Sequence, residues 1–165
     1  MKIRIIGCSG TGKTYFAQKL SAQLHIRACD LDEIFWDHSK RTYGTKLPIE
    51  KRDALLQDIL SGEDWIIEGV YYAWCQESFL QADKIYFLDI PAAVYKRRII
   101  IRFLRRKFSL EKQKIETFKS LSSLLLWTDT FQKNNVPEIK ELLSICKGEV
   151  VIIHSTAELN RILSI

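Results

Sequence analysis

Eight residues near the start of the chain have the types and the spacing of a phosphate-binding loop. The stretch GCSGTGKT at 7–14 fits the pattern G-x-x-x-x-G-K-[ST], in which backbone N–H groups surround a phosphate. A β-branched run at 2–6 precedes it, and a helix is predicted at 13–24. The N-terminus of that helix adds a favourable dipole for an anion. The sequence therefore predicts that the protein binds a nucleoside triphosphate.

The residues of this loop have separable roles. Lys13 is long enough to reach the β- and γ-phosphates, and the hydroxyl of Thr14 can ligate Mg²⁺. Glycines permit positive φ angles and a close approach of the backbone to the ligand. The other contacts to the nucleotide are assigned to Gly7, Ser9, Gly10, Thr11 and Gly12. ATP and Mg²⁺ are the expected cofactors.

The elements that must hold this loop alternate between strand and helix. Strands are predicted at 2–6, 26–29, 65–67, 84–88 and 150–153. Helices are predicted at 13–24, 48–60, 72–81, from Pro91 through a basic cluster, at 111–133, from Pro137 to about Cys146, and after Ser155 or Thr156. This alternation is typical of an α/β fold, with a parallel sheet covered by helices on both faces. The chain 1–165 is expected to form a single domain.

Carboxylates follow three of the other four predicted strands. Asp30 and Asp32 follow the second strand, Glu68 the third and Asp89 the fourth. Ligands of open parallel sheets gather beyond the carboxyl ends of the strands. Phosphoryl transfer needs an acid to hold Mg²⁺ or its waters, and often another to orient the acceptor hydroxyl. We assign Glu68 to Mg²⁺ and Asp32 to the acceptor, and we interpret Asp89 as a helix N-cap.

A basic segment follows the fourth strand. The chain has a net charge of +5, yet residues 91–120 alone hold ten Lys/Arg against two Glu. Arg98, Arg102, Arg105 and Arg106 recur at the spacing of one helix face. Guanidinium groups bind phosphate and stabilise the charge that develops during phosphoryl transfer. We assign this catalytic and nucleotide-binding role to Arg98 and Arg102, and interpret Arg97, Lys107 and Lys112 as a solvated basic face.

Composition excludes several classes of protein. Hydrophobic residues make up 47% and charged residues 27% of the chain, as in ordinary soluble globular proteins. The longest apolar runs, such as 124–127, are too short to cross a bilayer, so no membrane partner is expected. Four widely spaced cysteines without a C-x-x-C pair argue against disulfides or a metal site, and they fit a cytoplasmic protein.

Aromatic residues gather after two of the predicted strands. Phe35 and Trp36 follow the second strand, and Tyr71, Tyr72 and Trp74 follow the third. Such rings could stack on a nucleobase, form the wall of a substrate pocket, or pack in the core. The sequence leaves these three interpretations open.

Several motifs occur in the order found in a known family. They are the loop at 7–14, Asp32-x-x-Phe35-Trp36, Trp65-Ile66-Ile67-Glu68-Gly69-x-Tyr71, Phe87-Leu88-Asp89-x-Pro91 followed by Arg98 and Arg102, and Trp127 with Pro137-x-Ile139-x-x-Leu142-Leu143. Together, and over nearly the whole chain, they resemble the adenylate-kinase-related P-loop proteins known as DNA topology modulation proteins. Relatives more often have Asp-Gly-Asn-Tyr where this chain has EGVY at 68–71.

That resemblance implies a fold, a lid and further nucleotide contacts. The fold would be the three-layer P-loop NTPase α/β fold of nucleoside and nucleotide kinases, with a five-stranded parallel sheet of order 2-3-1-4-5. A short, mobile, Arg-rich lid would lie at roughly 103–113. Arg98 and Arg102 match lid-side arginines that clamp ATP, and Ser155, within HST at 154–156, would lie near the adenine.

Two functions from different classes are consistent with these features. The leading hypothesis is a Mg²⁺-dependent kinase that transfers a phosphoryl group from ATP to a small molecule or a nucleotide. The alternative is a nucleotide-dependent DNA-binding regulator that uses the basic segment on a nucleic-acid backbone without kinase turnover. A GTPase is disfavoured because the chain has no N-K-x-D stretch for guanine. A monomer and a homodimer both stay open.

Overall fold

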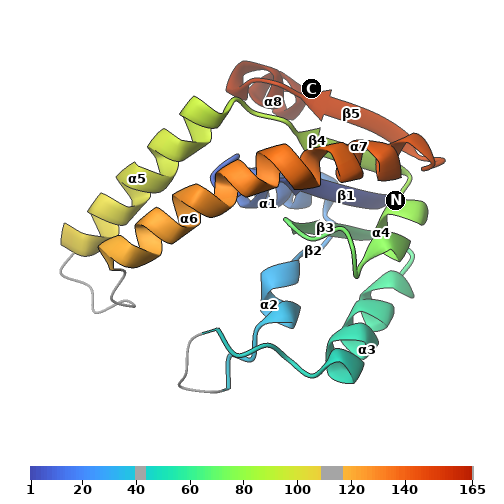
Figure 1. The fold of residues 1–165 in the computed structure, drawn as a ribbon. Helices are drawn as coiled ribbons and strands as arrows, with labels where there is room; N and C mark the ends of the chain where they lie inside the picture. Colours follow the sequence, from blue (N-terminus) through green and yellow to red (C-terminus); the bar gives the residue numbers. More distant parts are fainter. Residues whose placement is uncertain (40–43, 109–116, 165) are drawn as a thin grey trace.

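A computed structural model describes residues 1–39, 44–108 and 117–164. Within these ranges, five parallel strands form one sheet in the order β2-β3-β1-β4-β5 (Figure 1). They are β1 (Lys2–Gly7), β2 (Ala28–Asp30), β3 (Trp65–Gly69), β4 (Lys84–Leu88) and β5 (Glu149–Ile153). The predicted α/β fold and its strand order are confirmed. This order places the phosphate loop, which follows the central strand β1, between the ends of β3 and β4.

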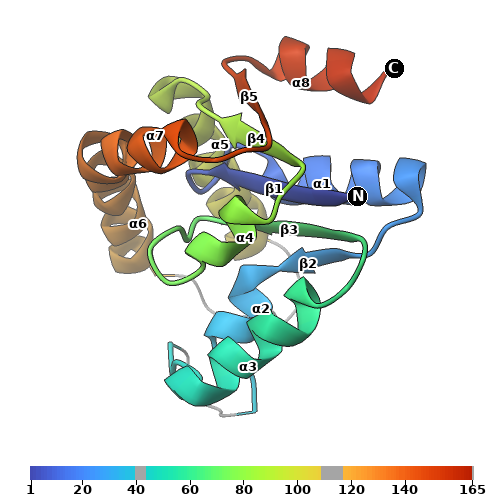
Figure 2. The same ribbon diagram turned by 90° about the vertical axis from the view of Figure 1, so that its right-hand side faces the viewer.

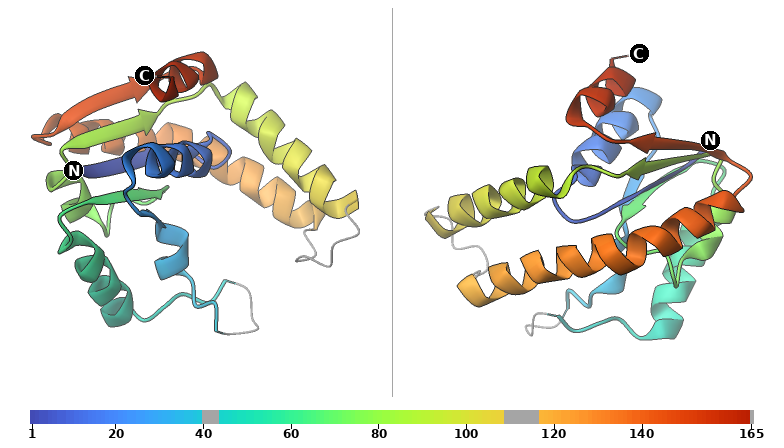
Figure 3. Two further views of the ribbon diagram at one scale, coloured as in Figure 1. Left: turned by 180° about the vertical axis from the view of Figure 1, so that it is seen from behind. Right: turned by 45° about the horizontal axis from the view of Figure 1, so that its top comes forward.

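Helices cover both faces of the sheet. One face carries α1 (Lys13–Leu24) and α8 (Thr156–Leu163), which lie side by side in Figures 2 and 3. The other helices are α2 (Leu31–Phe35), α3 (Ile49–Leu60), α4 (Gln76–Leu80), α5 (Ala92–Phe108), α6 (Phe118–Thr130) and α7 (Val136–Ser144). None of the helices in the described ranges has the length and apolarity needed to cross a membrane.

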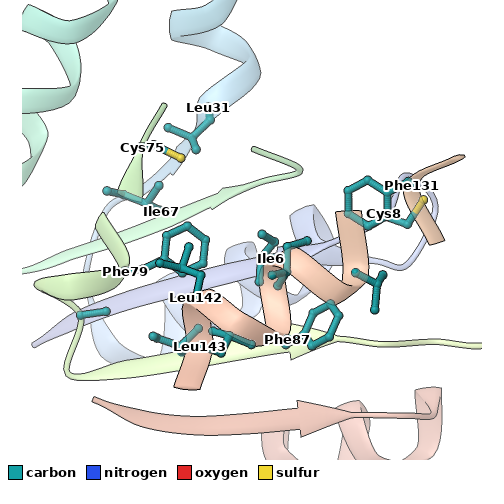
Figure 4. Packing of buried hydrophobic residues seen from close by; sticks show 14 of the residues in the cluster. Ile6, Cys8, Leu31, Ile67, Cys75, Phe79, Phe87, Phe131, Leu142 and Leu143 are labelled. Carbon is teal, nitrogen blue, oxygen red and sulfur yellow. The ribbon is translucent and has the colours of Figure 1, made fainter. Parts of the chain in front are cut away.

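The alternation of side chains along the strands separates two hydrophobic cores. Ile3 and Ile5 of β1 point towards α1 and α8, where they pack with Phe16 and Leu159. Ile6 belongs to the other core, which includes side chains from α3 to α7. Figure 4 shows Ile6 together with Phe79 and Leu142 of this core. That second core includes Ile67, Phe79, Phe87, Tyr95, Phe131 and Leu142. Because the strands are buried on both faces, their sequences are nearly continuous apolar runs and do not alternate between apolar and polar residues.

The C-terminal half differs from the prediction at Pro137. Instead of starting a new helix, Pro137 lies within a continuous helical rod, because a π-helix (Phe131–Asn135) joins α6 directly to α7. Proline has no N–H and its ring clashes with the carbonyl four residues before it in a regular helix. The wider π-turn immediately before Pro137 relieves that clash without ending the helix.

Two further predicted segments are shorter in the structure or lie partly outside it. The helix expected at 72–81 is confined to α4, and the segment before it contacts a buried arginine through the carbonyl oxygen of Tyr71 and the sulfur of Cys75. Of the lid expected at 103–113, residues 103–108 form the end of α5, and 109–113 lie outside the described residues. The predicted helix start at 111 also lies outside them, and α6 is described from Phe118.

That buried arginine is Arg4, in the middle of the central strand. Its side chain is 0% exposed, and its guanidinium lies 4.7 Å from the ring of Phe79. Nη1 donates a hydrogen bond to the carbonyl oxygen of Ile67 at 3.1 Å, and Nη2 donates to that of Tyr71 at 2.6 Å. Burial lowers the pKa of the guanidinium. Arg4 therefore fixes the backbone that follows β3.

We expect Arg4→Met to lower the free energy of unfolding by about 2–4 kcal/mol, because it leaves buried carbonyl oxygens without donors. Urea denaturation followed by circular dichroism measures this change. The matched control is Arg27→Met, an exposed arginine before β2, for which we expect less than about 0.5 kcal/mol. Equal effects of the two substitutions would contradict a structural role for the buried guanidinium.

Candidate functional site

A cleft of about 300 Å³ opens at the carboxyl ends of β1, β2 and β3. Its walls come from the phosphate loop, the start of α1, the ends of β2 and β3, and α5. The lining residues are Ser9, Gly10, Gly12, Lys13, Thr14, Tyr15, Asp30, Asp32, Glu68, Gly69, Val70, Arg98 and Arg102. Most of the residues predicted from the sequence therefore meet in one place. This is the position at which open α/β sheets bind ligands.

The phosphate loop has the backbone shape that its glycines predict. Gly10 and Gly12 have φ angles of 80° and 104°, a region that side chains with a Cβ rarely adopt. The hydroxyl of Thr11 donates to the carbonyl oxygen of Cys8 at 2.8 Å, which closes the turn. Gly7 and Thr11 lie outside the cleft lining, and their predicted contacts to the nucleotide stay predictions.

Lys13 and Thr14 place a cation and a hydroxyl beside one carboxylate. Lys13 is 8% exposed and its Nζ donates to the carbonyl oxygen of Cys8 at 3.1 Å. Burial lowers the pKa of this ammonium, and the charge of Glu68 opposes the shift. Glu68 is 3% exposed, and its Oε1 accepts a hydrogen bond of 2.5 Å from the hydroxyl of Thr14. The two residues predicted to handle Mg²⁺ are therefore in contact.

Asp32 is held by a tyrosine that the site prediction did not include. The hydroxyl of Tyr71 donates to Oδ1 of Asp32 at 2.7 Å. Burial and then this hydrogen bond raise the pKa of Tyr71, so its phenol keeps its proton. The ring of Tyr71 stacks on Phe35 at 4.4 Å, and Phe35 lies on the same short helix as Asp32. The sequence marked Tyr71 only as one of several aromatic residues.

Asp30 is a second site residue that the assignments missed. It pairs with Glu68 in the register of β2 and β3, and it lines the cleft. Its carboxylate accepts a hydrogen bond of 2.8 Å from the backbone N–H of Asp32 and caps α2. Burial, followed by the charge of Glu68, raises the pKa of Asp30 to about 6. Its place as the last residue of a strand was the available signal.

The two assigned arginines both reach the cleft from α5. Arg98 donates from Nη1 to the carbonyl oxygens of Gly10 at 3.4 Å and Thr11 at 3.0 Å. Arg102 follows one turn later and lines the same cleft. Residues Tyr95, Ile99 and Phe103 of α5 are buried in the core. The helix is thereby oriented with its arginines over the loop.

Two other strand-end residues have structural contacts. Ser155 caps α8, since its hydroxyl accepts from the backbone N–H of Glu158 at 3.1 Å, and it lies outside the cleft lining. Its predicted contact with the nucleotide stays a prediction. Asp89, which we interpret from the sequence as a helix N-cap, lies three residues before the first residue of α5, and its carboxylate forms an ion pair of 3.2 Å with Lys140 of α7.

The aromatic residues after β2 and β3 pack on one another. Trp74 lies 6.0 Å from Phe35, and Phe35 also meets Trp36 edge to face. The guanidinium of Arg52, from α3, lies 4.3 Å from the ring of Trp74. Since Phe35, Trp36 and Trp74 do not line the cleft, their contacts favour the packing interpretation over a base-stacking one.

The donor set suits Mg²⁺ bound together with a triphosphate. Across residues 1–39, 44–108 and 117–164, no group of three or more His, Cys, Asp or Glu could hold a metal by itself. Mg²⁺ normally keeps several waters and takes only one or two protein ligands, with phosphate oxygens completing its shell. A hydroxyl in contact with a buried carboxylate, as at Thr14 and Glu68, fits that requirement.

Solved structures of three kinases are similar to this chain. A shikimate kinase from Bacteroides thetaiotaomicron aligns with a TM-score of 0.61 and 16% identity, covering 99% of this chain and 94% of that one. A gluconokinase from Sinorhizobium meliloti gives 0.55 and 16%, covering 98% and 88%. A sugar kinase from Janibacter gives 0.54 and 17%, covering 99% and 92%. The chain has the P-loop kinase fold.

Sequence comparison adds less. No protein-family model matches the chain. The uncharacterized protein YqaC of Bacillus subtilis is 31% identical over 104 residues, which are 63% of this chain and 57% of YqaC. The aligned part thus spans little more than half of that relative. The resemblance to the DNA topology modulation proteins stays a prediction.

The raised pKa of Asp30 predicts a stability that depends on pH. Between about pH 4 and 6 the carboxyl group of Asp30 binds its proton more tightly in the folded protein than in the unfolded chain. The free energy of unfolding therefore falls as the pH rises through that window. Asp30→Asn keeps the cap and removes the charge. We expect the variant to be more stable than the wild type by about 1 kcal/mol at pH 7, after allowance for solvent screening, and equally stable at pH 4.

Urea denaturation at the two pH values measures this difference. Asp58→Asn, at an exposed position on α3, serves as the matched control for the loss of one carboxylate. A gap of the same size at pH 4 and pH 7 would contradict the predicted titration of Asp30.

Proposed function

We propose that the protein is an ATP-dependent, Mg²⁺-dependent kinase that phosphorylates a hydroxyl group of a small molecule or a nucleotide. The observation that carries this proposal is the single cleft shared by the phosphate loop, the acids at the ends of β2 and β3, and two arginines of α5. Each of these groups has a distinct task in phosphoryl transfer.

The loop side of the cleft would hold the triphosphate. Backbone N–H groups of the loop and the ammonium of Lys13 would bind its oxygens. When bound, Mg²⁺ offsets phosphate charge and orients the β- and γ-phosphates. The hydroxyl of Thr14 would hold the ion, and the carboxylates of Glu68 and Asp30 would accept hydrogen bonds from its waters.

The opposite side of the cleft would hold the acceptor. Asp32 would accept a hydrogen bond from the acceptor hydroxyl and take its proton as the new P–O bond forms. The bond between the γ-phosphorus and the β–γ bridging oxygen of ATP would break in the same transfer, with ADP as the leaving group. Tyr71 keeps one oxygen of this carboxylate in a fixed position. Arg98 and Arg102 would stabilise the charge that builds on the transferring phosphoryl group.

The kinases with similar folds support a small acceptor. Their names specify shikimate, a sugar and, for the third, gluconokinase activity, at identities of 16–17% to this chain. The cleft volume of about 300 Å³ lies at the lower end of the range for ligand pockets. A small hydroxyl compound therefore fits better than a macromolecule.

The test is ADP release in the presence of ATP and Mg²⁺ with a panel of nucleosides, nucleotides, sugars and hydroxy acids. With the acceptor that this panel identifies, we expect Asp32→Asn to lower kcat by about 100- to 10,000-fold, because the proton acceptor is lost. The dissociation constant of ATP should change less than about twofold, since Asp32 faces the acceptor.

Glu33→Gln is the matched control, because Glu33 is the next residue on the same helix and does not line the cleft. It should retain the wild-type kcat. The kinase proposal would be contradicted by ATP binding without any acceptor in the panel accelerating ADP release. A full rate in Asp32→Asn would remove only the role of this residue.

The DNA-binding alternative has one observation in its favour. The last turn of α5 exposes Arg105, Arg106 and Lys107 together. On the kinase proposal these residues form a solvated face, so we expect no submicromolar affinity for duplex DNA at physiological salt. A salt titration of binding by fluorescence anisotropy checks this. Tight binding that falls steeply with salt, and that is lost when the three residues are changed to Gln, would favour the regulator instead.

A further inference from the structure

One hydrogen bond joins the arginine-bearing helix to an element on the opposite face of the sheet. Nη2 of Arg98, on α5, donates to the hydroxyl of Thr156 at 2.6 Å. Thr156 is the first residue of α8, which packs against α1. The same guanidinium donates through Nη1 to the loop carbonyls of Gly10 and Thr11. Arg98 is therefore held from two sides, by the phosphate loop and by α8.

The hydroxyl of Thr156 is a well-fixed acceptor. The hydroxyl of Ser155 caps the backbone N–H of Glu158, and the carboxylate of Glu158 accepts from the backbone N–H of His154 at 2.8 Å. These two reciprocal bonds fix the first turn of α8. Leu159 anchors the same helix in the core beneath it.

We propose that Thr156 is a positioning residue for Arg98, and that it raises the affinity for ATP through that arginine without contacting the nucleotide. This inference rests on the proposed function only in taking ATP as the ligand. The long arginine side chain has many rotamers, and ordering them opposes binding. A planar guanidinium whose two terminal nitrogens are both already fixed by hydrogen-bond acceptors loses less freedom when a phosphate arrives.

The hydrogen bond to the Thr156 hydroxyl does not neutralise the positive charge of Arg98. It is a neutral acceptor, so the full charge stays available to a triphosphate on the loop. A carboxylate at this place would instead neutralise the arginine. The contact thus orients Arg98 and leaves its electrostatic contribution intact.

A double-substitution cycle on ATP affinity tests the proposal. We expect Thr156→Val to weaken ATP binding by about 5- to 10-fold in the wild-type background, the effect of one hydrogen bond to a charged donor. In the Arg98→Ala background the same substitution should change affinity less than about twofold, because its target is gone. Thr156→Ser, which keeps the hydroxyl, should restore wild-type affinity. Binding is measured by calorimetry with Mg²⁺ and a non-hydrolysable ATP analogue.

Each outcome of the cycle decides the proposal. A loss of the same size in both backgrounds would overturn it, because Thr156 would then act on the nucleotide directly. No loss in either background would overturn it as well. Because Thr156 is exposed, the Val variant should unfold at the wild-type temperature, which excludes a general loss of structure.

A second measurement separates this inference from the proposed function. The rotation of the Arg98 guanidinium can be followed by NMR of its Nη protons in the absence of any nucleotide. We expect slow rotation in the wild type and in Thr156→Ser, and fast rotation in Thr156→Val. If the wild-type protein does not bind ATP, the proposed function fails, while slow rotation would still show that Thr156 holds Arg98. Equally fast rotation in all three proteins would overturn the inference even where ATP binds.

Discussion

The guanidinium of Arg4 lies in the middle of the central strand with none of its surface exposed. Besides a hydrogen bond to the carbonyl oxygen of Ile5 in its own strand, it donates to backbone carbonyl oxygens of β3 and of the segment that follows β3. A buried charge is costly, and it is tolerated where several oriented dipoles replace its hydration. The hydrogen bonds that offset this cost also determine the backbone path after Gly69, because its carbonyl oxygens must lie close to the guanidinium. That path brings the hydroxyl of Tyr71 to the carboxylate of Asp32, a residue that lines the cleft.

The cleft itself combines charges that stability alone would not favour. Lys13 is buried beside Glu68, and Asp30 adds a second carboxylate across the strand pair. In the absence of ligand, burial disfavours the charged forms of both Lys13 and Asp30: it lowers the pKa of Lys13 and raises that of Asp30. The charge of Glu68 adds to the shift at Asp30 and opposes the shift at Lys13. A triphosphate with its metal would supply the missing counter-charges. Such mixed, desolvated charge is typical of sites that bind and transform a charged ligand.

Helix α5 shows how one element serves the core and the site together. Tyr95, Ile99 and Phe103 recur at a helical spacing and are buried, which fixes the rotation of the helix about its axis. With that rotation fixed, Arg98 contacts the phosphate loop and Arg102 lines the cleft. The contact between Arg98 and Thr156 then connects the loop to α8 on the far face of the sheet.

The sequence by itself determined the features that depend on near neighbours. The glycine loop, the positions of the strands, the acids that end them and the spacing of Arg98 and Arg102 are all local patterns, and the structure has each of them. Only the tertiary structure decided which distant residues meet. The contacts Thr14–Glu68, Tyr71–Asp32 and Arg98–Thr156 span 54, 39 and 58 residues. The hydrophobic periodicity of the sequence indicates which side chains are buried. Contacts between distant residues depend instead on the strand order and on how each helix packs. Both of these are determined by the packing of the whole core.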